Sequence, residues 1–283
     1  MKCEKFAGDS LSLNFFFHGH FIDHLTSRLE ELIRDSNVIV VEQEIRMTDG
    51  GLYESLLNEL SQGKPVVEDI LAIFSERYAS IGRNKFDKKF LESISGTKIQ
   101  ICLEDSPLTE NDHEVLIESE PLSPHVIPDP RESMRRYELQ ATYHRRRDMA
   151  LCDQIIAIRR DHPRANILVM RGAVHQRSIE KFLKGRREQF KSFHPYEPYV
   201  LVPITADILS KVEAGEPVTR KDFLMADVET VEMVKRFDDP WTATESEAVL
   251  RQIEESIQTM DEEQLTQYLK KAASKYENRH RWG

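Results

Sequence analysis

The chain has 283 residues, of which 40% are hydrophobic and 31% are charged, so it can form a substantial core beneath a strongly charged surface. A formal net charge of −10 argues against general nucleic-acid binding, which needs a basic face. The three cysteines are widely spaced, which fits a reducing compartment and no disulfide framework. We find neither a signal peptide nor a membrane span and expect a cytoplasmic protein.

The N-terminal region alternates between strand and helix. Residues 11–17 form an apolar run typical of a buried strand, and residues 24–36 carry apolar side chains at helical spacing. Residues 37–44 begin with β-branched side chains, as in a parallel strand covered on both faces. This order predicts a right-handed βαβ unit.

The middle of the chain predicts further helices, a third strand and a long loop. The strand covers residues 97–105, and residues 106–130 contain five prolines, which favour a loop or lid. A long helix follows from residue 131 and should end before Pro163. The three helices expected before the third strand cover residues 48–60, 66–82 and 85–95.

The last third predicts one more βα unit followed by helices. An apolar strand over residues 167–170 leads through Gly172 to a helix that begins near His175. A last strand is expected at 199–204, and helices at 219–237 and 244–276. We therefore predict an α/β fold: a mainly parallel sheet with helices on both faces in a body of residues 1–205, and a C-terminal helical extension of residues 206–283.

Four of the predicted strands lead directly into ionisable residues. The first ends at His18 and His20, and the next three end at Glu42, Glu104 and, past a glycine turn, His175. In a parallel sheet the carboxyl ends of the strands lie at one edge, where ligands bind. We therefore expect His20, Glu42, Glu104 and His175 to converge.

These residue types suit hydrolysis with or without a metal. His20, Glu42 and His175 could hold a divalent ion, which lowers the pKa of its bound water. Without a metal, a carboxylate or imidazole could take a proton from water while a cation stabilises the oxyanion. Arg147 is the candidate cation, because it lies where its helix turns from polar to apolar side chains; the two arginines before it are expected to face solvent. His144 is a candidate for a supporting role.

Three segments together resemble the TraB/Tiki-type superfamily, which includes erythromycin-esterase-like and haem-binding ChaN-like proteins. They are "VVE" at the end of the second strand, "RRRDMA" in the long helix and "ILVMRGAVHQRSIEKFL" after it. The family pattern has two G-x-x-H motifs, an acidic residue after the second strand and an arginine in the "RD" segment. The resemblance covers roughly residues 12–185 and leaves the helical extension unmatched.

The match can be made residue by residue. Gly172 and His175 fit the second G-x-x-H motif, Glu42 fits the acidic position, and the "RD" pair is Arg147 with Asp148. His20 fits the first histidine, but the chain has phenylalanine where the motif has glycine, which leaves open whether His18 or His20 takes that role.

The resemblance implies metal-dependent peptide cleavage, ester hydrolysis or haem binding. Our leading prediction is a hydrolase of ester or amide bonds in a small molecule or peptide. His20, Glu42 and His175 would bind a metal or activate water, Arg147 would hold an anionic group, and Glu104 would be a supporting carboxylate. The rivals are a ligand-binding protein of haem type and an inactive scaffold whose C-terminal helices bind a protein partner or self-associate.

Overall fold

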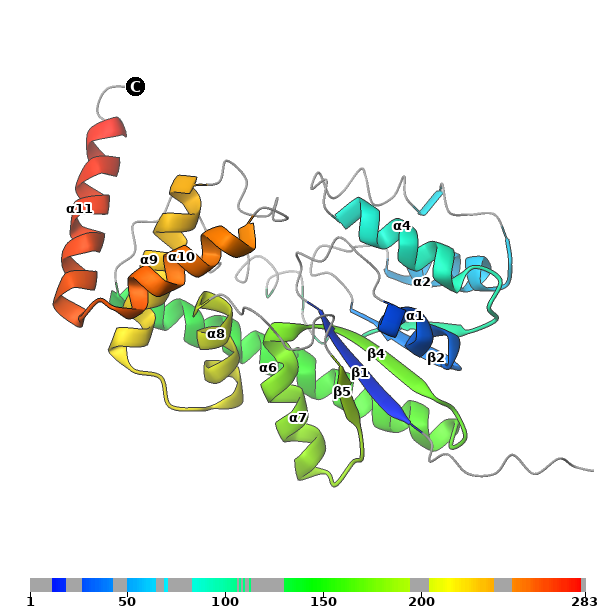
Figure 1. Cartoon of the computed structure of the whole chain (residues 1–283). Helices are drawn as coiled ribbons and strands as arrows, with labels where there is room; N and C mark the ends of the chain where they lie inside the picture. The colour runs from blue at the N-terminus through cyan, green and yellow to red at the C-terminus, as the bar shows by residue number, and fades with distance from the viewer. Residues whose placement is uncertain are drawn as a thin grey trace, which may run out of the picture.

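The computed structural model describes a five-stranded, all-parallel sheet with the strand order β3-β2-β4-β1-β5 (Figure 1). The described residues are 12–18, 27–42, 50–64, 69–70, 83–105, 107, 109, 112, 130–193, 204–236 and 246–280. The strands are β1 Leu13–His18, β2 Val38–Val41, β3 Gln100–Leu103, β4 Ile167–Gly172 and β5 Lys191–Phe193. The predicted α/β class is confirmed.

The described helices match predicted ones except α8, which lies between the strand predicted at 199–204 and the helix predicted at 219–237 and was not predicted. They are α1 Ser27–Arg34, α2 Gly50–Ser61, α4 Arg83–Ile94, α6 Pro130–Asp161, α7 Gln176–Gly185, α8 Ile204–Ala214, α9 Arg220–Arg236, α10 Ser246–Gln258 and α11 Glu262–His280. A 3₁₀ turn at Ala173–His175 joins β4 to α7. None of these helices is long and apolar enough to cross a bilayer.

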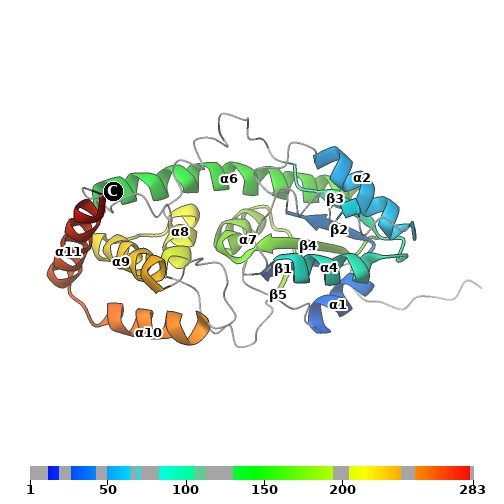
Figure 2. The same cartoon turned by 90° about the horizontal axis from the view of Figure 1, so that it is seen from above.

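Helices cover both faces of the sheet, because alternate side chains of a strand point to opposite faces. On β1, Phe16 packs into a core shared with α1, α2 and α4, whereas Phe15 and Phe17 pack with α6 and α7 on the other face. Figure 2 shows α6 along one side of the sheet with α1 and α4 on the other. This double coverage explains why the consecutive residues Phe15, Phe16 and Phe17 are all apolar.

The C-terminal helices form a separate hydrophobic core. Side chains of α8, α9, α10 and α11 pack together with Tyr137 of α6. Helix α6 is 32 residues long and runs from the sheet to these helices (Figure 2). The boundary after residue 205 stays a prediction, and α6 is the element shared by the two cores.

Side-chain contacts to backbone N–H groups mark where α11 and α8 begin. Predicted helical residues 244–276 divide into α10 and α11, because Asp261 and Gln264 form a reciprocal cap: Asp261 accepts the Gln264 N–H at 2.8 Å, and Gln264 accepts the Asp261 N–H at 2.9 Å. Helix α8 begins at Ile204, where the Glu229 carboxylate accepts the N–H groups of Ile204 and Thr205.

Several predicted segments fall wholly or mostly outside the described residues. Of the helix predicted at 66–82, only residues 69–70 are described, and most of the lid predicted at 106–130 lies outside the described residues. Of the strand predicted at 199–204, only residue 204 is described, and it begins α8. The strand β5 was not predicted, because it has only three residues, Lys191–Phe193, and no apolar run. It pairs with β1 at the edge of the sheet.

Candidate functional site

Three of the four residues expected at the strand ends come together. Glu42 follows β2, Glu104 follows β3, and His175 lies just beyond β4; β2 pairs with both other strands. His175 Nε2 lies 4.0 Å from Glu42 Oε1. His20 and the side chain of His18 lie outside the described residues, so the choice between them stays open.

Arg147 joins this group from α6, as the sequence predicted. Its Nε and Nη2 donate to Glu104 Oε1 at 2.8 and 2.5 Å, and Nη2 lies 3.7 Å from Glu42 Oε1. Its side chain is 3% exposed, whereas that of Arg146 is 46% exposed. The helical repeat explains this contrast, because adjacent residues on a helix point in different directions.

Arg171 is a buried cation that our sequence analysis did not single out. Its guanidinium hydrogen-bonds to Glu104 and, at 3.0 Å, to Asp148, and it lies 3.1 Å from Glu42 Oε1. Burial would lower its pKa, but the carboxylates of Glu104, Glu42 and Asp148 raise it more, so the group stays charged. Arginine inside a buried parallel strand was the signal that could have found it, because full burial of an arginine requires partners.

Burial sets the pKa of the two fully buried carboxylates in this network. It raises the pKa of Glu104 even though Arg171 and Arg147 oppose the shift. It raises the pKa of Asp148 in the same way against Arg171. Both carboxylates therefore depend on the guanidinium groups to remain ionised inside the protein.

His175 is positioned by the turn after β4. Gly172 donates its N–H to Glu42 Oε2 at 2.9 Å, and the 3₁₀ turn then places His175 at the N-cap of α7. His175 Nδ1 lies 3.1 Å from Asp148 Oδ1. Burial, with Arg171 and His144, lowers the pKa of the imidazole, so it is neutral near pH 7.

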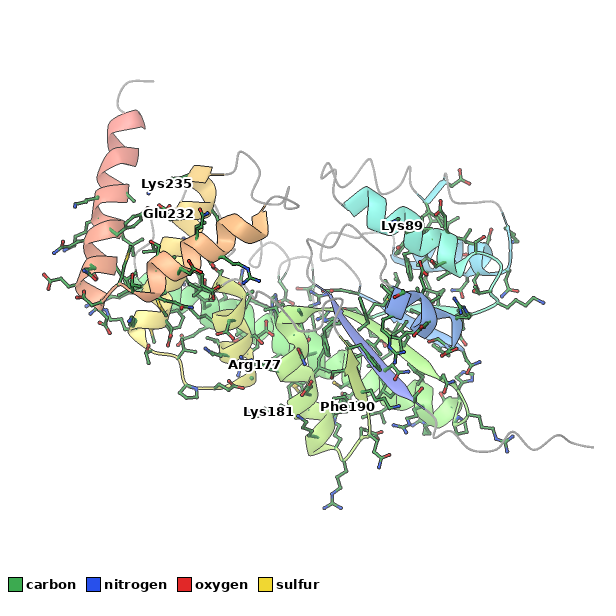
Figure 3. The ribbon with its side chains drawn as sticks, viewed as in Figure 1. Lys89, Arg177, Lys181, Phe190, Glu232 and Lys235 are labelled. Atoms are coloured by element: carbon green, nitrogen blue, oxygen red, sulfur yellow. The ribbon has the colours of Figure 1, made fainter. Side chains whose placement is uncertain are left out.

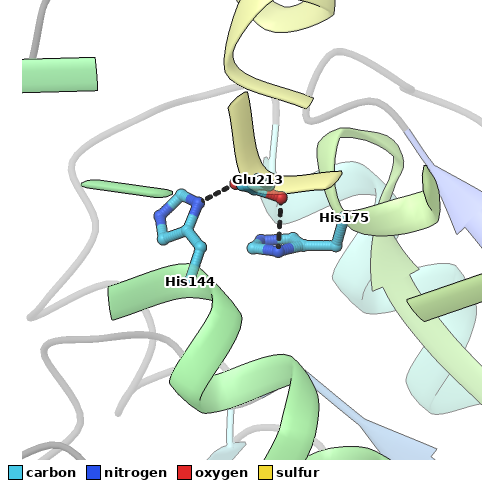
Figure 4. Close-up of side chains that lie close together, drawn as sticks. All are labelled: His144, His175 and Glu213. Atoms are coloured by element: carbon cyan, nitrogen blue, oxygen red, sulfur yellow. Dashed lines mark hydrogen bonds and ion pairs between the residues drawn. The ribbon is translucent and has the colours of Figure 1, made fainter. Parts of the chain in front are cut away.

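Two further residues complete the site. Figure 4 shows the Glu213 carboxylate between the imidazoles of His144 and His175. Glu213 hydrogen-bonds to His144 Nδ1, its Oε2 lies 3.6 Å from His175 Nδ1, and the two imidazole centroids are 4.7 Å apart. His144 precedes Asp148 by one helical turn of α6, which is why it reaches the same place. Glu213 comes from α8, in the segment predicted as an extension, and no local sequence signal linked it to the site.

The end of α8 fixes the backbone beside Glu213. Gly215 takes a left-handed φ of 68°, and the N–H groups of Gly215 and Glu216 bond back to Val212 O at 3.1 Å and Lys211 O at 2.9 Å. This is a Schellman ending, for which glycine is favoured. The sequence "VEAGEP", with a proline soon after the glycine, is typical of such an ending.

Helix α8 is also tied to α7. Figure 3 labels Arg177 and Lys181 on α7, from which they reach α8. Arg177 pairs with Asp207 at 2.8 Å, and Lys181 Nζ donates to Ala214 O at 2.5 Å. These contacts hold the carbonyl of Ala214, the residue after Glu213, against α7, whose N-cap is His175.

The protonation states of this second group follow from its burial. Burial lowers the pKa of His144 to about 4, and the positive charge of Arg147 contributes to the same shift. Burial raises the pKa of Glu213 well above its ordinary value, and the negative charge of Asp148 contributes to the same shift. Ligand atoms of His144, His175 and Glu213 all lie within 4.8 Å of one another, so the group could hold a metal ion.

Comparison with known proteins adds no assignment: no family model matches the chain, and neither a curated protein nor a solved structure is significantly similar to it. The resemblance to the TraB/Tiki-type superfamily stays a prediction. Function must therefore be argued from the geometry of the site.

Proposed function

We propose that the protein hydrolyses ester or amide bonds at the carboxyl end of its sheet. The observation that carries the proposal is the gap between His175 Nε2 and Glu42 Oε1. At 4.0 Å it is too long for a direct hydrogen bond, but one water molecule could bond to both atoms. Water held between an imidazole and a carboxylate is arranged for proton removal.

Glu42 is the general base in this scheme. Its side chain is 14% exposed, whereas that of Glu104 is 1% exposed, so Glu42 is the more open to a substrate. Its other oxygen accepts the Gly172 N–H, which fixes the carboxylate. The carboxylate takes a proton from the water as the water oxygen attacks the carbonyl carbon.

Arg147 supplies positive charge beside the reacting atoms. Its Nη2 lies 3.7 Å from Glu42 Oε1, and Glu104 holds the guanidinium through two hydrogen bonds. A fixed cation with little exposure to solvent stabilises the oxyanion that forms when water attacks a carbonyl. Glu104 thus acts as a positioning residue.

A divalent metal is compatible with this chemistry. When bound, such an ion polarises a carbonyl and lowers the pKa of its bound water. Neutral imidazoles and a carboxylate are suitable donors for it, and His144, His175 and Glu213 are the residues that would hold it.

Hydrolysis of nitrophenyl esters and of peptide nitroanilides by the full chain tests the proposal. We expect Glu42→Gln to lower kcat/KM by about 10²–10⁴-fold, the usual contribution of a general base. Glu59→Gln is the matched control, because Glu59 lies on the surface of α2 with its side chain 40% exposed.

Two results would overturn the proposal: no turnover of either substrate class by the wild-type chain, or equal activity of Glu42→Gln and wild type. Titration with haem belongs in the same experiment. A visible absorbance band that His175→Ala removes, without any turnover, would assign the site to ligand binding instead.

A further inference from the structure

We propose that His144, His175 and Glu213 bind one divalent cation of the Zn²⁺ type. The site takes ligands from three separate elements: α6, the turn before α7, and the C-terminal end of α8. It is a different set from the strand-end residues expected to bind metal, with only His175 in common. The ion would be the one compatible with the proposed hydrolysis, but its binding does not require that the protein hydrolyses esters or amides, so a failure of one proposal leaves the other standing.

Two buried atoms of this group lack hydrogen-bond partners within the described structure. They are Glu213 Oε2 and His175 Nδ1, which lie 3.6 Å apart. Asp148 Oδ1 lies 3.1 Å from the same nitrogen but outside hydrogen-bond geometry, and it accepts a hydrogen bond from Arg171. Buried polar atoms without protein partners are uncommon in native proteins, and a bound ion or an ordered water molecule often satisfies them.

The charges of the surrounding side chains also favour a divalent cation. Among the described residues, the carboxylates of Glu42, Glu104, Asp148 and Glu213 lie close to one another around the guanidinium groups of Arg147 and Arg171, and the charge of Arg145 also acts on Glu213. A divalent cation beside these carboxylates is favoured by their negative charge.

The donor atoms identify the class of cation. Two imidazole nitrogens and one carboxylate suit Zn²⁺ and its late first-row neighbours, whereas Mg²⁺ and Ca²⁺ prefer oxygen alone. Tetrahedral ligands at about 2.0–2.1 Å from Zn²⁺ lie about 3.4 Å apart. Glu213 already hydrogen-bonds to His144 and lies 3.6 Å from His175, and all three ligand atoms lie within 4.8 Å of one another, so side-chain rotations that bring them closer would complete the site.

The surroundings can hold the ligands in place. Asp148 lies beside the His175 ring, and Arg171 holds Asp148 at 3.0 Å. This carboxylate lies at the same ring nitrogen that faces Glu213, so it adds negative charge beside the cation. The His144 side chain is 12% exposed and gives the group its route to solvent.

Calorimetric titration of the full chain, stripped with chelator, with ZnCl₂ tests the site directly. We expect one Zn²⁺ per chain and no competition from excess MgCl₂. Glu213→Gln should weaken Zn²⁺ affinity by at least about 100-fold, because it removes the ligand charge. Glu216→Gln is the matched control: Glu216 lies three residues away, exposed, and pairs with Arg177.

The visible spectrum of the Co²⁺ complex of the wild-type chain decides the case even if a variant does not fold. Intense bands of a four- or five-coordinate ion support the site, whereas the weak bands of a hexaaqua-like ion overturn it. Absence of stoichiometric Zn²⁺ binding overturns it, as does equal binding by wild type and a folded Glu213→Gln. If Glu216→Gln weakens Zn²⁺ binding as much as Glu213→Gln does, the effect comes from surface charge and the proposed site is wrong.

Discussion

Arg171→Met should be the most destabilising single change at this edge of the sheet. The guanidinium is completely buried and contacts three carboxylates, Glu42, Glu104 and Asp148. Methionine has a similar length and leaves little cavity, so the cost comes from unpaired charge. Removing one member of a buried ion pair usually costs about 3–5 kcal/mol of folding free energy.

The remaining contacts keep the expected loss within that range. Arg147 still donates two hydrogen bonds to Glu104 in the variant, at 2.8 and 2.5 Å in the present structure. Asp148, by contrast, loses the guanidinium that bonds to it at 3.0 Å. We therefore expect Arg171→Met to lower the free energy of unfolding by about 3–5 kcal/mol near pH 7.

The loss should depend on pH in a known direction. The folded-state pKa values of Glu104 and Asp148 are raised above their ordinary values of 4.5 and 3.8 by burial, even with Arg171 present. A carboxylate with a raised folded-state pKa binds its proton more tightly when folded, so stability falls as pH rises from the unfolded value through the folded one. Removing Arg171 raises both pKa values further. The destabilisation should therefore be smaller near pH 5 than near pH 7.

Urea denaturation followed by far-ultraviolet circular dichroism at both pH values measures this effect. Arg160→Met is the control, because Arg160 is 76% exposed and pairs only with Asp161 among the described contacts; it should leave the midpoint unchanged. Adding Asp148→Asn to Arg171→Met should recover part of the loss, since the two residues are in direct contact. Equal stability of Arg171→Met and wild type near pH 7, or the same loss at both pH values, would refute the reasoning.

Three further outcomes follow from burial and contacts. Arg147→Ala should reduce hydrolysis far more than Arg146→Ala, because of these two arginines it is Arg147 that is buried beside Glu42. Equal losses of kcat/KM in the two variants would contradict this. Glu229→Gln should lower the free energy of unfolding by about 2 kcal/mol in urea, since the buried carboxylate accepts the first N–H groups of α8, whereas the exposed Glu255→Gln should not. Cys152, whose pKa burial raises to about 12, should resist thiol reagents in a chain with the other cysteines replaced by serine until that chain unfolds; rapid labelling of the native chain would show otherwise.

The sequence alone was sufficient for four of the five described strands and for part of the site. Apolar runs with turn signals located four strands, because strands buried on both faces need apolar side chains at nearly every position. The rule that parallel strands end at one edge predicts that His20, Glu42, Glu104 and His175 lie together; the last three do, and His20 lies outside the described residues. Helical periodicity distinguished the buried Arg147 from its neighbour Arg146.

Tertiary structure alone decided which other residues reach the site. Arg171 appears in the sequence as one polar residue in an apolar strand, and only the packed sheet shows its three carboxylate partners. Glu213 lies 38 residues beyond His175, on a helix that was not predicted from the sequence. Local periodicity reports which face of an element is buried, but not which distant element covers that face. That choice depends on how α6, α7 and α8 pack, and their packing places Glu213 between two histidines.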